Sequence, residues 1–202
     1  MPSIRTACVV EAFEDMENGM PGGPDGLKIA RGWNSSAFNL IVPGFGSTTS
    51  FLGYFAQGQR PRKTFQLTPA STNVRVKFDF LQLSSWDGCS MYGPDNFKVF
   101  VNDKLVDFGC FYFAYYGTVD DVTLSGTTSD GVIWTRSFVR KVPDFDTEIH
   151  EMTMDIPLSL ITTGSLTLEF FADVNEGDAN EVAGIDNLKV ISCPQNKVFP
   201  AI

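Results

Sequence analysis

The sequence has little of what many enzymes and metalloproteins need. Its 202 residues contain a single histidine, His150, and four cysteines, none of them in a C-x-x-C pair. A Ser-His-Asp or Cys-His site would have to use that histidine, and no G-x-S-x-G nucleophile motif is present. The missing C-x-x-C spacing also argues against a zinc or redox site. We therefore expect no enzymatic activity, and we expect His150 to be a surface residue of a strand.

Long apolar runs and an excess of positive charge are also missing. No stretch approaches the roughly 20 apolar residues of a membrane span, and the first residues, MPSIRTACVVEAFEDMENG, lack the apolar region of a signal peptide. The formal net charge is −9, and an acidic surface repels phosphates. We expect neither nucleic-acid binding nor membrane insertion. The charge suits cations, calcium above all, although acidic surfaces also keep secreted proteins soluble.

Strand patterns, in contrast, are present along the whole chain. In VRVKFDF (74–80) the apolar residues alternate with charged ones, which predicts a half-buried antiparallel strand. FKVFVNDKLVDF (97–108) predicts two strands around a turn at Asn102-Asp103. Further strands are expected in TSFLGYFA (49–56), KTFQL (63–67), GVIWTRSFVRKV (131–142), SLTLEFFADV (165–174) and GIDNLKVISC (184–193).

No helix of any length is expected, apart from one helical turn after Pro157. The segments 19–32 and 45–49 are rich in breakers and are expected to be loops. About eight to ten strands over this length predict one all-β domain spanning residues 1–202. The expected architecture is an antiparallel two-sheet β-sandwich of jelly-roll type.

The four cysteines predict two disulfides and an oxidising compartment. Of the three possible pairings we favour Cys89–Cys110, which closes a local loop, and Cys8–Cys193, which ties the two ends together. The local loop would contribute roughly 3 kcal/mol in the chain-entropy model. Four buried thiols in a cytosolic protein are the alternative.

Two aspartates lie in turns on either side of a short loop. Asp87 follows Trp86 in a Trp-Asp-Gly turn, and Asp95 follows in a Gly-Pro-Asp turn. Calcium prefers carboxylate, amide and carbonyl oxygens in flexible loops, so these side chains are candidate ligands together with Asp178 and Glu181 of the acidic loop NEGDANE. Turn chemistry, in which Asp bonds its own backbone, is the alternative.

Four patches resemble extracellular jelly-roll modules, the broad group that includes carbohydrate-binding modules and MAM adhesion domains. The patches are EAFEDMENG with a following GW, FLGYF, VKFDFLQLSSWDG with GPDNFKVFVN, and FFADVNEGDANEVAGIDNLKV. The resemblance implies that the first strand lies near the last and that a structural calcium binds there. It points to early acidic residues and to one late aspartate as ligands: Glu11, Glu14, Asp15, Glu17 and Asp186.

Aromatic residues mark a possible ligand surface. The run FYFAYY (111–116) places five rings in six positions, and a strand of period two cannot turn all of them inward. The candidate ligand-binding rings are Trp86, Tyr92, Tyr112, Tyr115 and Tyr116. Burial under a loop is the alternative for the run, and core anchoring is the alternative for the tryptophans.

These patterns favour a non-enzymatic, calcium-dependent module that is secreted or displayed at the cell surface. It would recognise a glycan or an extracellular protein through loops at one end. The alternative is a structural subunit that self-assembles into a filament, coat or matrix. A glycan-active enzyme is less favoured: carboxylates are abundant, but TEIHEMTMD (147–155) does not match the E-x-D-x-x-E cluster of sandwich-fold glucanases.

Overall fold

The computed structural model of the chain describes residues 7–21, 25, 27–34, 40–44, 46, 48–68, 73–90, 93–112, 123–142, 146–161, 163–176, 180–194 and 199. Regular structure in this part of the chain is almost entirely β-strand. Helical conformation there is limited to Asp25 and to one short 3-10 helix, η3 (Leu158–Leu160), directly after Pro157. The all-β prediction and the predicted helical turn are both confirmed.

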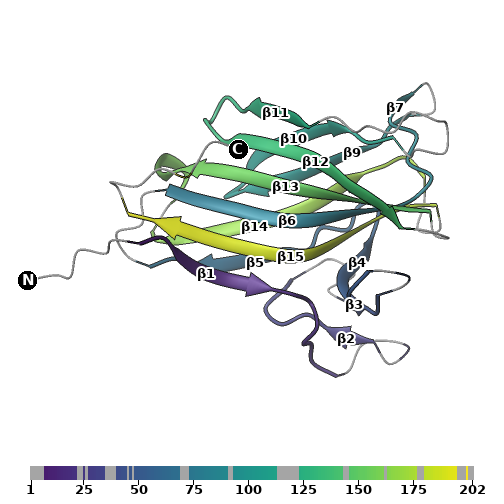
Figure 1. Ribbon diagram of the computed structural model, residues 1–202, viewed down its shortest axis with the longest axis horizontal. Helices are drawn as coiled ribbons and strands as arrows, with labels where there is room; N and C mark the ends of the chain where they lie inside the picture. The colour runs from purple at the N-terminus through teal and green to yellow at the C-terminus, as the bar shows by residue number, and fades with distance from the viewer. Residues whose placement is uncertain are drawn as a thin grey trace, which may run out of the picture.

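The strands form two antiparallel sheets that pack face to face (Figure 1). The larger sheet runs in the order β11 (Leu124–Thr127), β12 (Ile133–Val142), β13 (Thr147–Pro157), β6 (Asn73–Ser84), β15 (Glu181–Cys193), β4 (Phe51–Phe55), β3 (Leu40–Val42), β2 (Lys28–Ile29), and β1 (Val9–Glu14) also pairs with β15. The smaller sheet runs β10 (Lys104–Cys110), β9 (Asn96–Val101), β14 (Ser165–Asp173), β5 (Arg62–Gln66). A short pair, β7 (Cys89–Ser90) and β8 (Gly93–Pro94), lies at one end.

The core fills the space between the two sheets. Alternation on β6 turns Val74, Val76, Phe78 and Phe80 inward, as predicted, and all four are buried. Rings from both sheets meet there: the centroids of Phe80 and Phe97 are 4.1 Å apart in a stacked pair. Burying so many large rings supplies the main stabilisation of the sandwich. This arrangement confirms the β-sandwich, while its finer classification as a jelly roll stays a prediction.

The predicted hairpin is present between β9 and β10. Its turn residues Asn102 and Asp103 both have positive φ, 47° and 66°, as a type I′ turn requires. The side chain of Asn102 also donates to the carbonyl of Leu160 at 2.6 Å and accepts from the N–H of Thr167 at 2.7 Å. One residue therefore shapes the hairpin and ties it to β14.

Other predictions need adjustment. The breaker-rich segment 19–32 contains the short strand β2, and Met20 forms a bridge with Ile29. The strands β3 and β11 and the short β7–β8 pair were not predicted, and for β13 only the strand position of His150 was expected. None of the helical structure in the described residues is long and apolar enough to cross a membrane.

The expectation that His150 is a surface residue is wrong. It lies on β13, but its side chain faces the core and is 4% exposed. Its Nε2 lies 3.1 Å from Oε1 of Gln82, and its ring packs against Phe80, Phe111 and Phe138. Glu148, on the same face of β13, is also buried. Burial, and then the positive charge of Arg136, lower the pKa of His150 to about 3.

Candidate functional site

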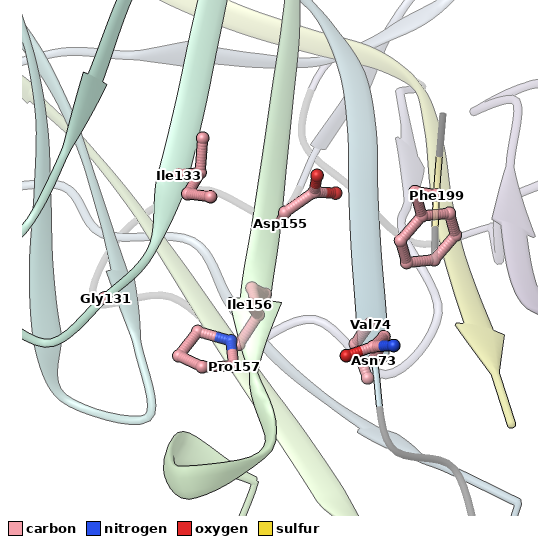
Figure 2. Close-up of a pocket in the computed structure, with 8 residues that line it drawn as sticks. All are labelled: Asn73, Val74, Gly131, Ile133, Asp155, Ile156, Pro157 and Phe199. Atoms are coloured by element: carbon pink, nitrogen blue, oxygen red, sulfur yellow. The ribbon is translucent and has the colours of Figure 1, made fainter. Parts of the chain in front are cut away.

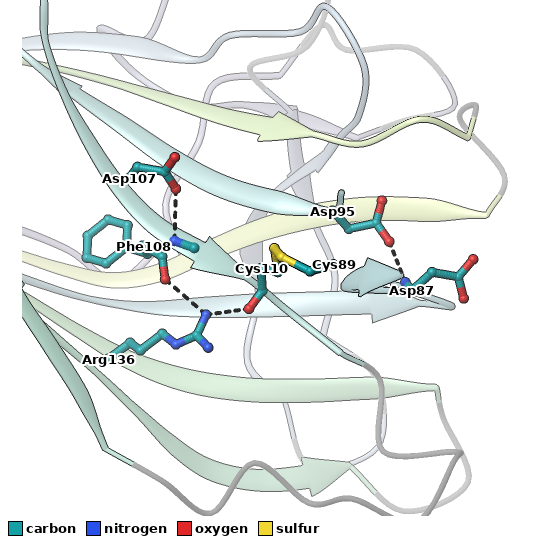
Figure 3. Close-up of a disulfide and its surroundings, with 8 residues drawn as sticks. Asp87, Cys89, Asp95, Asp107, Phe108, Cys110 and Arg136 are labelled. Atoms are coloured by element: carbon teal, nitrogen blue, oxygen red, sulfur yellow. Dashed lines mark hydrogen bonds between the residues drawn. A yellow bond between two sulfur atoms is a disulfide. The ribbon is translucent and has the colours of Figure 1, made fainter. Parts of the chain in front are cut away.

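Both predicted disulfides are present. Cys8–Cys193 joins the start of the described chain to the end of β15, and Cys89–Cys110 joins β7 to the end of β10. Covalent pairing of this kind is typical of an oxidising, extracellular environment. The second disulfide braces the loop that carries Asp87 and Asp95 (Figure 3).

Asp95 lies at the end of that loop, and backbone hydrogen bonds fix its position. Its backbone N–H donates to the carbonyl of Gly88 at 2.9 Å, and its carbonyl accepts from the N–H of Phe111 at 2.9 Å. Its carboxylate Oδ2 accepts a short hydrogen bond from the N–H of Asp87. The side chain of Asp87 points away from Asp95 (Figure 3). Asp95 is fully buried. Hydrogen bonding within the turn accounts for the position of Oδ2, but it provides no donor for Oδ1.

Glu181, at the start of β15, lies beside Asp95 and is also fully buried. Its Oε2 accepts from the N–H of Glu176 at 2.9 Å. Asp95 Oδ1 and Glu181 Oε1 receive no N–H or hydroxyl donor from the described residues. Burial above all, and then the nearby charges of Asp95 and Glu176, raise the pKa of Glu181 to about 7. Burial likewise raises the pKa of Asp95.

A second group of carboxylates surrounds Asp186 in the middle of β15. Asp186 lies opposite Asp79 on β6, and the amide of Asn187 donates to Asp79 at 2.9 Å. Asp186 Oδ2 accepts a short hydrogen bond from the hydroxyl of Thr49, and Oδ1 accepts from the N–H of Asn187 at 2.7 Å. Burial, and more weakly the charges of Asp79 and Glu17, raise the pKa of Asp186 to about 6. Asp79 could not be predicted as part of this group, because only the register between β6 and β15 brings it opposite Asp186.

The early acidic candidates do not converge on Asp186. Glu14 pairs with Lys63 at 2.7 Å, and Asp15 accepts from the N–H of Glu17 at 3.2 Å in an exposed turn. Glu17 bonds the N–H and hydroxyl of Ser50, next to Thr49. Of the predicted ligands in the described residues, Asp95 and Glu181 therefore form one group, and Asp186 lies in a second group with Glu17 nearby. Glu14 and Asp15 belong to neither group.

Glu11 lies apart from both groups. Its carboxylate accepts from the N–H and hydroxyl of Thr68 and from the hydroxyl of Ser192. The candidate Asp178 lies outside the described residues. Within the described residues, no three Asp, Glu, His or Cys side chains form a group that would hold a metal ion by themselves.

The predicted ligand-binding rings also divide. Trp86 is a core residue: its ring packs against Phe80 and Phe111, and its Nε1 donates to the carbonyls of Leu83 and Val182. Its faces are covered, which corrects its choice as a ligand platform and agrees with the core-anchor alternative. Tyr112 is 41% exposed and packs on Gly88. The remaining candidates, Tyr92, Tyr115 and Tyr116, lie outside the described residues.

The outer face of the smaller sheet carries an aromatic feature that was not predicted from the sequence. Phe100 on β9 and Phe171 on β14 occupy diagonal positions on this face, since Phe100 pairs with Glu169 and Phe171 pairs with Lys98. The guanidinium of Arg60 lies over both rings, 5.3 Å and 4.2 Å from their centroids. The sequence did contain a sign of this feature: both phenylalanines stand at strand positions that alternate with the buried ones and would ordinarily be polar. We call this set the ring platform: Phe100, Phe171, Arg60 and Glu169.

Charged pairs border the ring platform. Arg60 bonds Glu169 at 3.1 Å, Arg62 lies 3.3 Å from Asp103, and Lys98 pairs with Asp173. The hydroxyls of Thr64 and Thr167 are hydrogen-bonded at 2.8 Å across β5 and β14. This face therefore presents aromatic rings, hydroxyl groups and charged side chains, and the positive charges are paired with nearby carboxylates.

A separate hollow of about 220 Å³ lies on the larger sheet (Figure 2). It is lined by the start of β6 and the end of β13, whereas the loop that carries Asp95 follows the other end of β6. Its walls include Ile133, Pro157 and Phe199. The carboxylate of Asp155 lies at its edge, but Arg75 engages both carboxylate oxygens and stacks on Phe199 with its guanidinium carbon 4.5 Å from the ring centroid. We assign no function to this hollow.

Comparisons with known proteins give no family assignment. No protein-family model matches the chain, and no curated protein sequence matches it. The function is therefore inferred from the geometry described above.

Proposed function

We propose that the protein is a non-enzymatic extracellular module that binds a glycan on the outer face of the smaller sheet, with calcium stabilising the fold around it. The ring platform supports this proposal above any other observation. The Arg60 guanidinium lies over the half-buried rings of Phe100 and Phe171, so it is the planar group against which a sugar ring would pack. Its N–H groups and the fixed charged groups beside it can hydrogen-bond to sugar hydroxyls. The two disulfides agree with an extracellular location.

The charges on this face favour a neutral glycan over a charged ligand. The chain carries a net charge of −9, yet Arg60, Arg62 and Lys98 each pair with a carboxylate there. Pairing fixes these side chains as hydrogen-bonding groups and leaves little net field to attract an ion. A protein partner is less well supported, because protein interfaces need a larger apolar patch than this face offers. Among the described residues of this face, the most exposed large apolar side chain is Leu105, at 44%.

The core position of His150 supports a binding function over catalysis. The sequence holds one histidine, and this side chain is buried with a pKa lowered to about 3. It is therefore neutral at physiological pH and poorly placed to exchange protons with a bound ligand.

Affinity electrophoresis tests the proposal directly. The protein would be run through gels that contain neutral or acidic polysaccharides, with millimolar calcium present. We expect retardation by at least one neutral polysaccharide and a loss of affinity of about tenfold or more in Phe100→Ala/Phe171→Ala, equivalent to about 1.4 kcal/mol. Failure of every polysaccharide to retard the wild type would overturn the proposal.

A matched control is available on the other sheet. Phe13 on β1 is 51% exposed, and Nζ of Lys189 lies 4.9 Å from its ring centroid. It is another phenylalanine with a cation over its ring, but it lies outside the ring platform. Phe13→Ala should bind polysaccharide as the wild type does. An equal loss in Phe13→Ala would show that the effect is not specific to the platform.

The edge of the larger sheet favours a second candidate function, a self-assembling structural subunit. β11 is an edge strand, and its neighbour β12 exposes Ile133 and Val139 at 48% and 53%. Exposed apolar residues near an unpaired edge promote strand pairing between molecules. Light scattering after size exclusion separates the two functions: a monomer with and without calcium supports the binding module, and a large or calcium-dependent assembly supports the subunit.

A further inference from the structure

Asp95 and Glu181 share an unusual pattern of hydrogen bonding. In each carboxylate one oxygen is fixed by a backbone N–H, from Asp87 or from Glu176. The other oxygen, Asp95 Oδ1 or Glu181 Oε1, is buried without an N–H or hydroxyl donor from the described residues. The two carboxyl groups lie close enough for the charge of Asp95 to raise the pKa of Glu181. Two negative charges at such a distance in a buried site require compensation.

We propose that Asp95 Oδ1 and Glu181 Oε1 are ligands of a calcium ion that binds between the β6–β9 loop and the start of β15. Calcium takes oxygen ligands in flexible geometry and completes its shell with carbonyls and water. Protein ligands of metals are commonly oriented by a hydrogen bond to the atom that does not bind the metal. The backbone N–H groups of Asp87 and Glu176 have that role for this pair.

The site is organised before the ion binds. The backbone of Asp95 is fixed to Gly88 and Phe111, and the Cys89–Cys110 disulfide braces the same loop. A ligand held in place loses little conformational freedom on binding, which increases affinity. Because Asp95 precedes β9 of the smaller sheet and Glu181 begins β15 of the larger sheet, the ion would link the two sheets at this end.

The Asp186 group differs from this site in its hydrogen bonding. Both carboxylate oxygens of Asp186 already accept hydrogen bonds, from Thr49 and from Asn187. Both oxygens of Glu17 accept from Ser50. Protein donors therefore compensate the Asp186 group, whereas each member of the Asp95–Glu181 pair has an oxygen still to be compensated.

Terbium luminescence and thermal unfolding test the calcium site. Tb³⁺ occupies oxygen-rich calcium sites, and Trp86, next to Asp87 in the sequence, is a nearby ring that can sensitise its emission. We expect sensitised emission that calcium displaces. We also expect the unfolding temperature to rise by about 5–10 °C at a calcium concentration 100-fold above Kd.

Three variants locate the ion. Glu181→Gln and Asp95→Asn keep the shape of each side chain but remove a charge, and each should lose at least about tenfold in Tb³⁺ affinity and most of the calcium-induced shift. Asp186→Asn, the matched control, should keep both. Unfolding of each variant in chelator verifies that it is folded.

Three results would overturn the inference. The first is a wild type with no calcium response, which would mean that a shared proton compensates the pair. The second is a response that persists in Glu181→Gln and Asp95→Asn. The third is a response lost in Asp186→Asn alone, which would place the ion at the second carboxylate group. Because these measurements use no polysaccharide, their outcome is independent of the proposed glycan binding.

Discussion

Asp79 and Asp186 lie directly opposite each other on the neighbouring strands β6 and β15. Two carboxylates in such a pair repel each other, and the pKa of both is raised, chiefly by burial. The amide of Asn187 donates to Asp79, and its backbone N–H donates to Asp186. One residue thus partly compensates two acids, at a point where the β15 ladder is interrupted between Asp186 and Lys189.

Because of this pair, we expect the free energy of unfolding to depend on pH when it is measured in chelator, without bound metal. The pKa of Asp186 is raised from 3.8 to about 6 in the folded state, so its contribution is most favourable below pH 4 and is lost as the pH rises to about 6. Asp186→Asn removes the charge and keeps an acceptor for Thr49, but its NH2 group replaces the oxygen that accepts from the N–H of Asn187, which offsets part of the gain. We expect this variant to be more stable than the wild type at pH 7, by roughly 1 kcal/mol after solvent screening.

Urea unfolding at pH 4 and pH 7 measures the difference between the two proteins. Asp79→Asn serves as the control, since it removes the repulsion from the opposite strand and should change stability in the same direction by a few tenths of a kcal/mol to about 1 kcal/mol. A wild type that exceeds Asp186→Asn in stability at pH 7 would contradict the argument.

His150 gives a pH dependence of opposite sign. Its folded pKa of about 3 lies below its ordinary value of 6.5, so its contribution is fully present above pH 6.5 and is lost as the pH falls toward 3. The charged groups that face it are Arg136 and Glu148, with Glu148 Oε2 at 3.8 Å. Between pH 7 and pH 5 this residue should remove about 2 kcal/mol of stability.

The matched variant is His150→Gln, which does not titrate and keeps a polar group beside Gln82. It should lack this loss, so that the difference in unfolding free energy between wild type and variant changes by about 2 kcal/mol over that pH range. Parallel pH profiles would show that His150 does not titrate as its burial predicts.

How much the sequence predicted depended on whether the signal was local. The hairpin at Asn102-Asp103 and the strand of β6 were predicted because turn residues and alternation lie within a few positions of each other. The disulfide pairs were favoured from loop length and chain ends, and both are present. Asp95 and Glu181 were named as metal candidates because each lies in an acidic loop.

Features that depend on register between distant strands were missed. Asp79 meets Asp186 only because β6 pairs with β15 in one particular register. Phe100 and Phe171 are neighbours because β9 pairs with β14, and each alone looks like an ordinary strand residue. His150 is buried because it lies on the face of β13 that turns toward the core, which is set by how this strand is placed in the sheet. A one-residue shift in register would reverse each of these assignments.

The turn between β9 and β10 allows a matched pair of glycine variants. Asn102 and Asp103 both have positive φ, a conformation that glycine adopts without cost. Asp103 is exposed, so Asp103→Gly should stabilise the protein by a few tenths of a kcal/mol to about 1 kcal/mol. Asn102→Gly should destabilise it by about 1–3 kcal/mol, because the bonds to Leu160 and Thr167 are lost.

The urea concentrations at the unfolding midpoints of Asn102→Gly and Asp103→Gly, compared with that of the wild type, test this prediction. Opposite signs would show that the contacts of the Asn102 side chain to Leu160 and Thr167 outweigh its backbone conformation. Destabilisation by both variants would instead mean that the 3.3 Å ion pair of Asp103 with Arg62 contributes more than exposed pairs usually do.

The two disulfides should differ in their effect on metal binding. Cys89–Cys110 spans a sequence separation of 21, and Cys8–Cys193 spans 185. The chain-entropy model assigns them about 3 and about 5 kcal/mol, so Cys8→Ala/Cys193→Ala should be the less stable double variant. Cys89→Ala/Cys110→Ala should nevertheless bind Tb³⁺ more weakly, because its loop holds Asp95. Since the order of stability and the order of Tb³⁺ affinity are then reversed, a general loss of stability cannot produce this result, and equal Tb³⁺ affinities would mean that the disulfide does not organise the site.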